Sequence, residues 1–236
     1  MTILLTAMGL AFLAGMSIPA GAFVATRPFL TKICLRYEVD SFVSYFGGGA
    51  LLAAIALVLI PQGIEHNTTM AAAVAFLAGS ICIWRLNAFL KKKGGAASQF
   101  MGMLLDYIPE SIVLGAVMHS TPAMAYVLAG LIALQNMPEG FAASIEMRKA
   151  QLSAKTLWLL FLAAPAVGAL SAWLGVGLLS RADPALGLLG LFCSGGILYL
   201  IFDDIAPQAH VRYHDFPAIG AVLGFLLGMV GTMMVH

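Results

Sequence analysis

The chain has 236 residues, of which 61% are apolar and only 10% are charged, and its 12 basic and 11 acidic residues leave a net charge of +1. A soluble domain carries about 25% charged residues, so most of this chain must lie in a lipid bilayer. This composition excludes a soluble enzyme and a disordered protein, and it gives no reason to expect nucleic acid as a partner.

Eight apolar segments along the chain are long enough to form transmembrane helices, which need about 20 mostly apolar residues each. Their connections have turn chemistry, as at Pro61-Gln62-Gly63 and Asp183-Pro184. We therefore expect an all-α membrane protein with one transmembrane domain, residues 1–236. The predicted spans are 3–25, 41–61, 69–90, 100–119, 123–146, 155–178, 185–205 and 216–235.

The basic residues are distributed unevenly over the connections between these spans. Only Arg181 lies in an even-numbered connection. Because basic connections stay inside, both termini are predicted to lie outside, in a multi-pass protein of the inner or plasma membrane. The three consecutive lysines Lys91, Lys92 and Lys93 would have the same orientation if they instead anchored the protein to anionic lipid. The other eleven basic residues lie in or beside the odd-numbered connections: Arg27, Lys32, Arg36, Arg85, Lys91, Lys92, Lys93, Arg148, Lys149, Lys155 and Arg212.

Spans four and five contain two copies of one polar pattern, in which a polar residue is followed by two residues, a proline, a glutamate and a small residue. The copies are Asp106-Tyr107-Ile108-Pro109-Glu110-Ser111 and Gln135-Asn136-Met137-Pro138-Glu139-Gly140. The first and fifth positions of each copy share a helix face. Each proline is expected to kink its helix and to free the carbonyl four residues earlier.

The antiparallel arrangement of spans four and five is expected to bring the two copies together. Glu110 and Gln135 should lie near the midplane, with Asp106 and Glu139 facing each other nearer the inner side. Three carboxylates cannot all stay ionised in a low dielectric without a cation or protons, and a divalent cation suits these oxygen ligands. Asn136 is a candidate outer ligand. The alternative, that these polar groups only join helices, is weaker for two matching copies than for one.

The doubled pattern, within eight spans and a basic third connection, resembles the ZIP (Zrt/Irt-like) family of divalent metal transporters. Residues 46–61 are similar to that family's second span, and residues 195–207 are similar to its seventh. The resemblance covers nearly the whole chain. It implies a ZIP-like helical bundle that moves zinc, iron or manganese ions inward.

Compared residue by residue with the family's usual His-Asn-x-Pro-Glu-Gly pattern, the first copy departs at three positions. Asp106 takes the place of the histidine, Tyr107 that of the asparagine and Ser111 that of the glycine. Gln135, Asn136, Glu139 and Gly140 fall on the corresponding positions of span five. A glutamate that family members supply in span six is replaced by Ala164, beside Pro165. These departures imply one all-oxygen metal site, which favours Mn²⁺ or Fe²⁺ over Zn²⁺.

We therefore expect a carrier rather than an enzyme, with no cofactor beyond the transported cation. Its partners are the cation and the bilayer, and a homodimer is one option for its assembly. Two alternatives stay open: a ZIP-like receptor or assembly protein without transport, and an intramembrane metal-dependent hydrolase.

Weaker candidates lie at both membrane surfaces. Glu65 and His66 fall in an outer connection, where a solvated loop is the simpler interpretation. On the inner side, a group of acidic and histidine residues is a candidate exit site for the cation, and ordinary membrane-edge polarity is the simpler interpretation: Asp203, Asp204, His210, His214 and Asp215.

Overall fold

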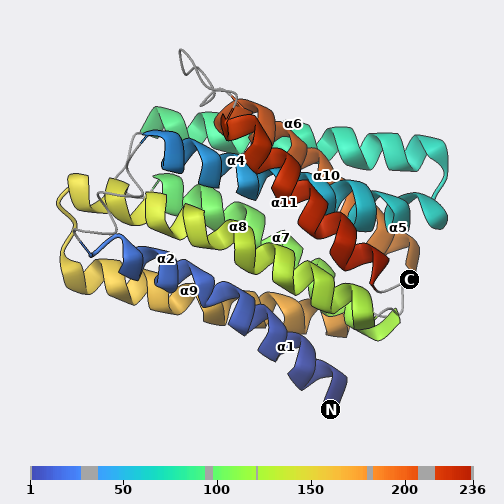
Figure 1. Cartoon of the computed structure of the whole chain (residues 1–236). Helices are drawn as coiled ribbons and strands as arrows, with labels where there is room; N and C mark the ends of the chain where they lie inside the picture. The colour runs from blue at the N-terminus through green and yellow to red at the C-terminus, as the bar shows by residue number, and fades with distance from the viewer. Residues whose placement is uncertain are drawn as a thin grey trace.

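The computed structural model of the chain describes residues 2–27, 37–93, 98–120, 122–179, 183–206 and 216–234, and every regular element in these ranges is helical. Figure 1 shows the helices lying side by side in one bundle. The α-helices are α1 (Thr2–Gly15), α2 (Ser17–Val24), α4 (Tyr37–Ala54), α5 (Ile60–Glu65), α6 (Thr69–Lys93), α7 (Ser98–Ser120), α8 (Pro122–Lys149), α9 (Ala154–Leu174), α10 (Asp183–Leu200) and α11 (Phe216–Met233). The π-helical segments are η1 (Ile55–Leu59), η2 (Gly175–Leu179) and η3 (Ile201–Ile205).

Several elements continue one another, so that the described residues form eight helical rods at the positions of the eight predicted segments. α1 leads into α2 through Met16 alone, and η1, η2 and η3 continue α4, α9 and α10 without a loop. Connections such as 66–68 and 150–153 are short enough to require antiparallel neighbours. With eight alternating rods, both ends of the chain lie at the same end of the bundle (Figure 1).

Six of these rods, within the described residues, are long and apolar enough to cross a membrane. The α8 helix has 28 residues, which is ample length, but Gln135, Asn136 and Glu139 interrupt its apolar sequence. α11 offers a shorter apolar stretch, Ala218–Met233. Over the residues that it describes, the structure thus confirms the all-helical class, with six helices that have the length and apolarity needed to cross a membrane. The six candidates are Thr2–Val24, Ser41–Glu65, Thr69–Phe89, Phe100–Met118, Ala154–Gly177 and Pro184–Asp203.

The rods pack as two groups. α7 and α8 pack on each other and on α1, α2 and α9, which we call the first group. α4, α5, α6, α10 and α11 form the second group, in which α4 packs on α11 and α6 on α10. Contacts of α8 with α4 and of α7 with α10 join the groups. The polar pattern therefore lies on the two helices of the first group that also face the second.

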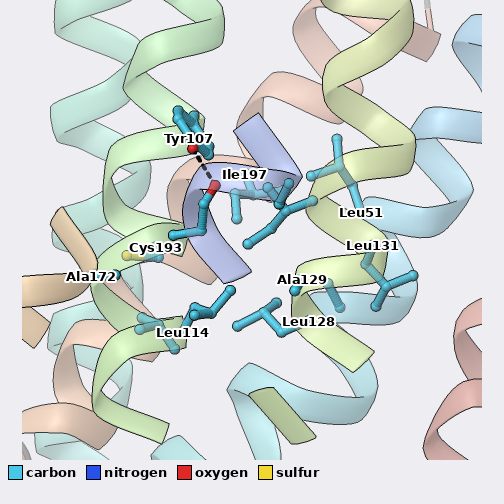
Figure 2. Close-up of a cluster of buried hydrophobic side chains, with 14 of the residues drawn as sticks. Leu51, Tyr107, Leu114, Leu128, Ala129, Leu131, Ala172, Cys193 and Ile197 are labelled. Carbon is cyan, nitrogen blue, oxygen red and sulfur yellow. Dashed lines mark hydrogen bonds between the residues drawn. The ribbon is translucent and has the colours of Figure 1, made fainter. Parts of the chain in front are cut away.

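Buried apolar side chains from both groups fill the space beside the polar pattern. Leu114 of α7 and Leu128 of α8 belong to this cluster, together with Leu51 of α4 and Ile197 of α10 (Figure 2). Leu114 and Leu128 lie one to two turns from Glu110 and Gln135, toward the end of the bundle that carries the 66–68 connection. On that side the polar groups are covered by apolar packing.

Glycines permit the closest helix crossings of the second group. A Cβ atom added at Gly49 of α4 would lie 2.0 Å from the carbonyl oxygen of Ala221 on α11. A Cβ atom at Gly195 of α10 would lie 2.0 Å from that of Phe76 on α6. Any side chain at these positions would force the helices apart.

Exposed basic residues gather at one end of the bundle. Lys92 lies in the last turn of α6, Arg148 and Lys149 in the last turn of α8, and Lys155 in the first turn of α9. The opposite end carries the exposed residues Glu65 and His66. The two ends therefore differ in charge, as the distribution in the sequence predicts.

Candidate functional site

The two copies of the polar pattern occupy the middle turns of α7 and α8. Both helices continue through their prolines, Pro109 and Pro138. Because proline has no N–H group, the carbonyls of Leu105 and Leu134 lack their usual helical donor. Each helix thus has an under-satisfied backbone oxygen close to its acidic residue.

Glu110 and Gln135 meet across the interface between α7 and α8. The side-chain amide of Gln135 donates a hydrogen bond from Nε2 to Oε2 of Glu110 over 2.5 Å. Glu110 is fully buried and Gln135 is 1% exposed. The contact confirms that these residues lie at the same level, and it places a carboxylate deep in the protein with a neutral amide as its hydrogen-bond partner.

Unsatisfied polar atoms concentrate around this contact. Seven buried side-chain atoms have no hydrogen-bond partner among the described residues, and five of them belong to the second pattern or to Glu110. Burying such an atom without a partner is costly, so a cluster of them marks a place that suits a polar or charged ligand. The five atoms are Glu110 Oε1, Gln135 Oε1, Asn136 Oδ1, Asn136 Nδ2 and Glu139 Oε2.

Asp106 and Glu139 flank this centre and are half-buried. Both residues interact with other groups. Within the described ranges, no three or more His, Cys, Asp or Glu side chains are grouped so that they could hold a metal ion. The carboxylates of Asp106, Glu110 and Glu139 therefore do not form a ready three-carboxylate site in this arrangement.

Tyr107 faces away from the predicted ligands and is fully buried between α1 and α9. Its hydroxyl donates a 2.6 Å hydrogen bond to the carbonyl oxygen of Ala11, the bond drawn in Figure 2. Gly15 and Gly168 form the slot for its ring, because a Cβ atom at either position would lie about 2 Å from the tyrosine hydroxyl (2.1 and 1.8 Å). Tyr107 thus fixes α7 to its two neighbours in the first group.

The second copy of the pattern is held tightly against α2. A Cβ atom at Gly140 would lie 2.4 Å from the carbonyl oxygen of Ile18, and one at Gly21 would lie 2.0 Å from that of Met137. These two glycines bring the backbones of α2 and α8 together beside Glu139. The final residue of the second pattern is therefore small for a packing reason.

The weaker candidates are not drawn into this centre. Glu65 and His66 are exposed, and the adjacent Asn67 donates hydrogen bonds to the carbonyls of Gly63 and Pro184. Asp203 accepts a 3.0 Å hydrogen bond from Asn87 of α6. The side chain of Asp204 and the residues His210, His214 and Asp215 lie outside the described residues.

Sequence reasoning missed two features of α7 and α8. Ser111 and Ser144 are fully buried, and neither hydroxyl has a hydrogen-bond partner in the described part of the chain. The packing role of Tyr107 was also missed. The glycines at positions 15 and 168 were its only signal, and nothing in a single sequence pairs them with residue 107.

The position of Ala164, where the resemblance implies a missing glutamate, is buried in α9. It adds no polar group to the centre. The polar side chains brought together there come from α7 and α8, and their oxygens are carboxylate and amide oxygens. No protein-family model matches the sequence, and no curated protein matches it either.

Proposed function

We propose that the protein is a ZIP-like carrier that moves a divalent metal cation inward across the membrane. The cation is its substrate and would bind between α7 and α8, at Asp106, Glu110, Gln135 and Glu139, with Asn136 as an outer ligand. The proposed class of substrate is Zn²⁺, Fe²⁺ or Mn²⁺.

The observation that carries this proposal is the buried pair of Glu110 and Gln135, in which each side chain keeps one oxygen without a hydrogen-bond partner among the described residues. Glu110 Oε1, Gln135 Oε1 and Asn136 Oδ1 are buried and accept no hydrogen bond among the described residues. A buried carboxylate is unfavourable unless a positive charge or a proton compensates it. In the described structure the hydrogen-bond partner of Glu110 is the neutral Gln135, which leaves room for a cation as the compensating charge.

The chemistry of these donors favours hard and borderline cations. Carboxylate and amide oxygens suit Mn²⁺ and Fe²⁺ and bind Zn²⁺ as well, whereas softer metals prefer thiolate. A bound cation would have to draw the carboxylates of Asp106 and Glu139 toward Glu110. Both residues are within one helical turn of the centre, so this requires side-chain rotation rather than refolding.

The division of the bundle into two groups supports a moving-carrier mechanism. The proposed ligands all lie on α7 and α8, and Tyr107, Gly140 and Gly21 fix these helices to α1, α2 and α9. The first group could therefore slide or rock against the second as one unit, carrying the cation with it. Binding sites between helix segments near the midplane are typical of such carriers.

The proposed orientation of the protein in the membrane follows from the position of its basic residues at one end of the bundle. Lys92, Arg148, Lys149 and Lys155 would lie inside, and both termini outside, by the positive-inside rule. Apolar packing around Leu114 and Leu128 covers the centre on its outer side.

Uptake into liposomes tests the proposal. Purified protein is reconstituted in vesicles that contain a metal-sensitive dye, and Mn²⁺, Fe²⁺ or Zn²⁺ is added outside. We expect uptake by the parent, loss of uptake in Glu110→Gln, and uptake near the parent level in Glu146→Gln, which changes a carboxylate near the end of α8. Parent protein that binds the cation without transporting it would instead support the receptor alternative. Protein that neither binds nor transports it would overturn the proposal.

A further inference from the structure

The α6 helix leaves most of its surface uncovered by the rest of the bundle. It packs on α10 through one face, where Ser80 donates a 2.9 Å hydrogen bond to the carbonyl oxygen of Gly195 and Asn87 donates to Asp203. Ile83 belongs to this face, because a Cβ atom at Gly196 would lie 2.6 Å from its Cγ1 atom. Only 11% of the apolar window Thr69–Phe89 is buried, the lowest share among the six candidate spans.

Two basic residues lie on the opposite face of α6. Successive helical residues are rotated by about 100°, so Arg85 lies about 200° and Lys92 about 180° around the axis from Ile83. Both side chains are exposed. They therefore point away from α10, along a line about 10 Å long that runs toward the basic end of the bundle.

Arg85 lies inside the apolar span but has no carboxylate partner in the described structure. Its guanidinium carbon lies 4.8 Å from the centre of the Trp84 ring. Asp203, the acidic residue that α6 does contact, lies on the other face and is bonded to Asn87. An exposed guanidinium in contact with hydrocarbon is unfavourable and requires an anion or water.

We propose that Arg85, Lys92 and the indole of Trp84 form a binding site for the phosphate headgroup of an anionic phospholipid in the leaflet at the basic end. The planar guanidinium can donate two parallel hydrogen bonds to a phosphate. Lys92, seven residues nearer the membrane surface, adds positive charge along the same face. Trp84 is exposed beside them, and tryptophan favours the headgroup region of a bilayer.

This site is separate from the proposed cation centre. It belongs to the second group of helices, whereas Glu110 and Gln135 belong to the first. A bound lipid would hold α6, and through it α10, at a fixed depth in the membrane. The lipid site does not depend on metal transport, and either proposal can fail without the other.

Quenching of Trp84 fluorescence by brominated lipids tests the site. Trp158→Phe and Trp173→Phe leave Trp84 as the single tryptophan of the full chain. The protein is reconstituted in phosphatidylcholine vesicles that contain the same mole fraction of either brominated phosphatidylglycerol or brominated phosphatidylcholine. We expect stronger quenching by the anionic lipid, corresponding to about fivefold enrichment near Trp84, the size expected for one basic residue at an anionic surface.

Variants in the same background identify the residues responsible. Arg85→Gln should remove the excess quenching. Arg85→Lys should keep part of it, because the positive charge remains while the two parallel hydrogen bonds of the guanidinium are lost. Lys155→Gln, a basic residue at the same end of the bundle on α9, should leave the excess unchanged. Circular dichroism melts confirm that each variant is folded.

Three outcomes would overturn the proposal. The first is equal quenching by the two brominated lipids in the parent. The second is an excess that persists in folded Arg85→Gln. The third is loss of the excess quenching at an inorganic phosphate concentration far below that of the anionic lipid, with chloride of the same ionic strength having no effect, which would identify the preferred ligand as free phosphate instead of lipid.

Discussion

Gln135 donates a 2.5 Å hydrogen bond to Glu110. The first residue of the second copy of the polar pattern therefore contacts the fifth residue of the first copy. This is the result of an antiparallel pairing of α7 and α8. The same pairing puts the other first and fifth residues, Asp106 and Glu139, one turn away along each helix. The doubled pattern thus places a neutral amide and a carboxylate at one level of the bundle, with the other two acidic residues one helical turn away.

Exchanging the two side chains of this pair should preserve cation binding. Glu110→Gln removes the charge and should weaken Mn²⁺ binding at least tenfold, roughly the effect of losing a group that supports a metal. The protein should still fold, because a buried amide is no worse than an unpaired carboxylate. The double variant Glu110→Gln with Gln135→Glu restores one carboxylate and one amide in the same volume and should recover much of the affinity.

Isothermal titration calorimetry in detergent at two pH values measures this effect. A carboxylate must be unprotonated to bind the cation, so the affinity of the parent should fall as the pH falls. Thermal melts control for folding. A double variant that binds as weakly as Glu110→Gln would show that the two positions do not share one cation.

Removing the hydroxyl of Tyr107 should destabilise the first group of helices. Tyr107→Phe loses the hydrogen bond to the carbonyl of Ala11, with an expected cost of about 1 kcal/mol. Tyr107→Ala also leaves a large cavity between α1 and α9 and should cost about 3–5 kcal/mol. Melting temperatures in detergent measure both. Equal melting temperatures for Tyr107→Ala and the parent would contradict the packing role.

The helical rods and the pairing of Glu110 with Gln135 could be predicted from the sequence, because both depend on features of short segments. Twenty-residue apolar segments specify membrane-length helices, and the antiparallel order of α7 and α8 then fixes that Glu110 lies level with Gln135. The placement of Tyr107 could not be predicted in this way. Its slot is formed by Gly15 and Gly168, which are distant in sequence and carry no polar signal. Within the described residues Asp106 and Glu139 do not join Glu110 in a group of three acidic side chains, and side-chain positions of this kind depend on packing, which residue spacing does not encode.

The close crossing of α2 and α8 should make Gly140 intolerant of a side chain. A Cβ atom there would lie 2.4 Å from the Ile18 carbonyl oxygen, so Gly140→Ala should cost about 1–3 kcal/mol through overpacking. Gly130→Ala on the same helix is the matched control, because nothing lies within 4 Å of its added Cβ atom. The control should be neutral or slightly stabilising, since alanine favours helix over glycine. Equal loss of thermal stability in both variants would refute this packing argument.

The orientation of the bundle can be tested at two exposed connections. In a background without Cys34, Cys82 and Cys193, Ala150→Cys lies between α8 and α9 at the basic end, and His66→Cys lies at the opposite end. A membrane-impermeant thiol reagent added to intact cells should label the cysteine at position 66 and reach the one at position 150 only after lysis. The reverse pattern would place the basic end outside, against the positive-inside rule.

Replacing Asp106 with histidine should change the preference among metals. Asp106 is half-buried, one turn before Glu110, where a longer side chain can reach the same centre. Imidazole is a softer ligand than carboxylate, so Asp106→His should favour Zn²⁺ over Mn²⁺ relative to the parent. Competition between Zn²⁺, Fe²⁺ and Mn²⁺ during liposome uptake measures the order of preference. Glu65→His is the matched control, because it makes the same kind of change at an exposed residue outside the centre. A shift in Asp106→His but not in Glu65→His would identify Asp106 as a ligand, whereas an unchanged order in both would remove Asp106 from the site.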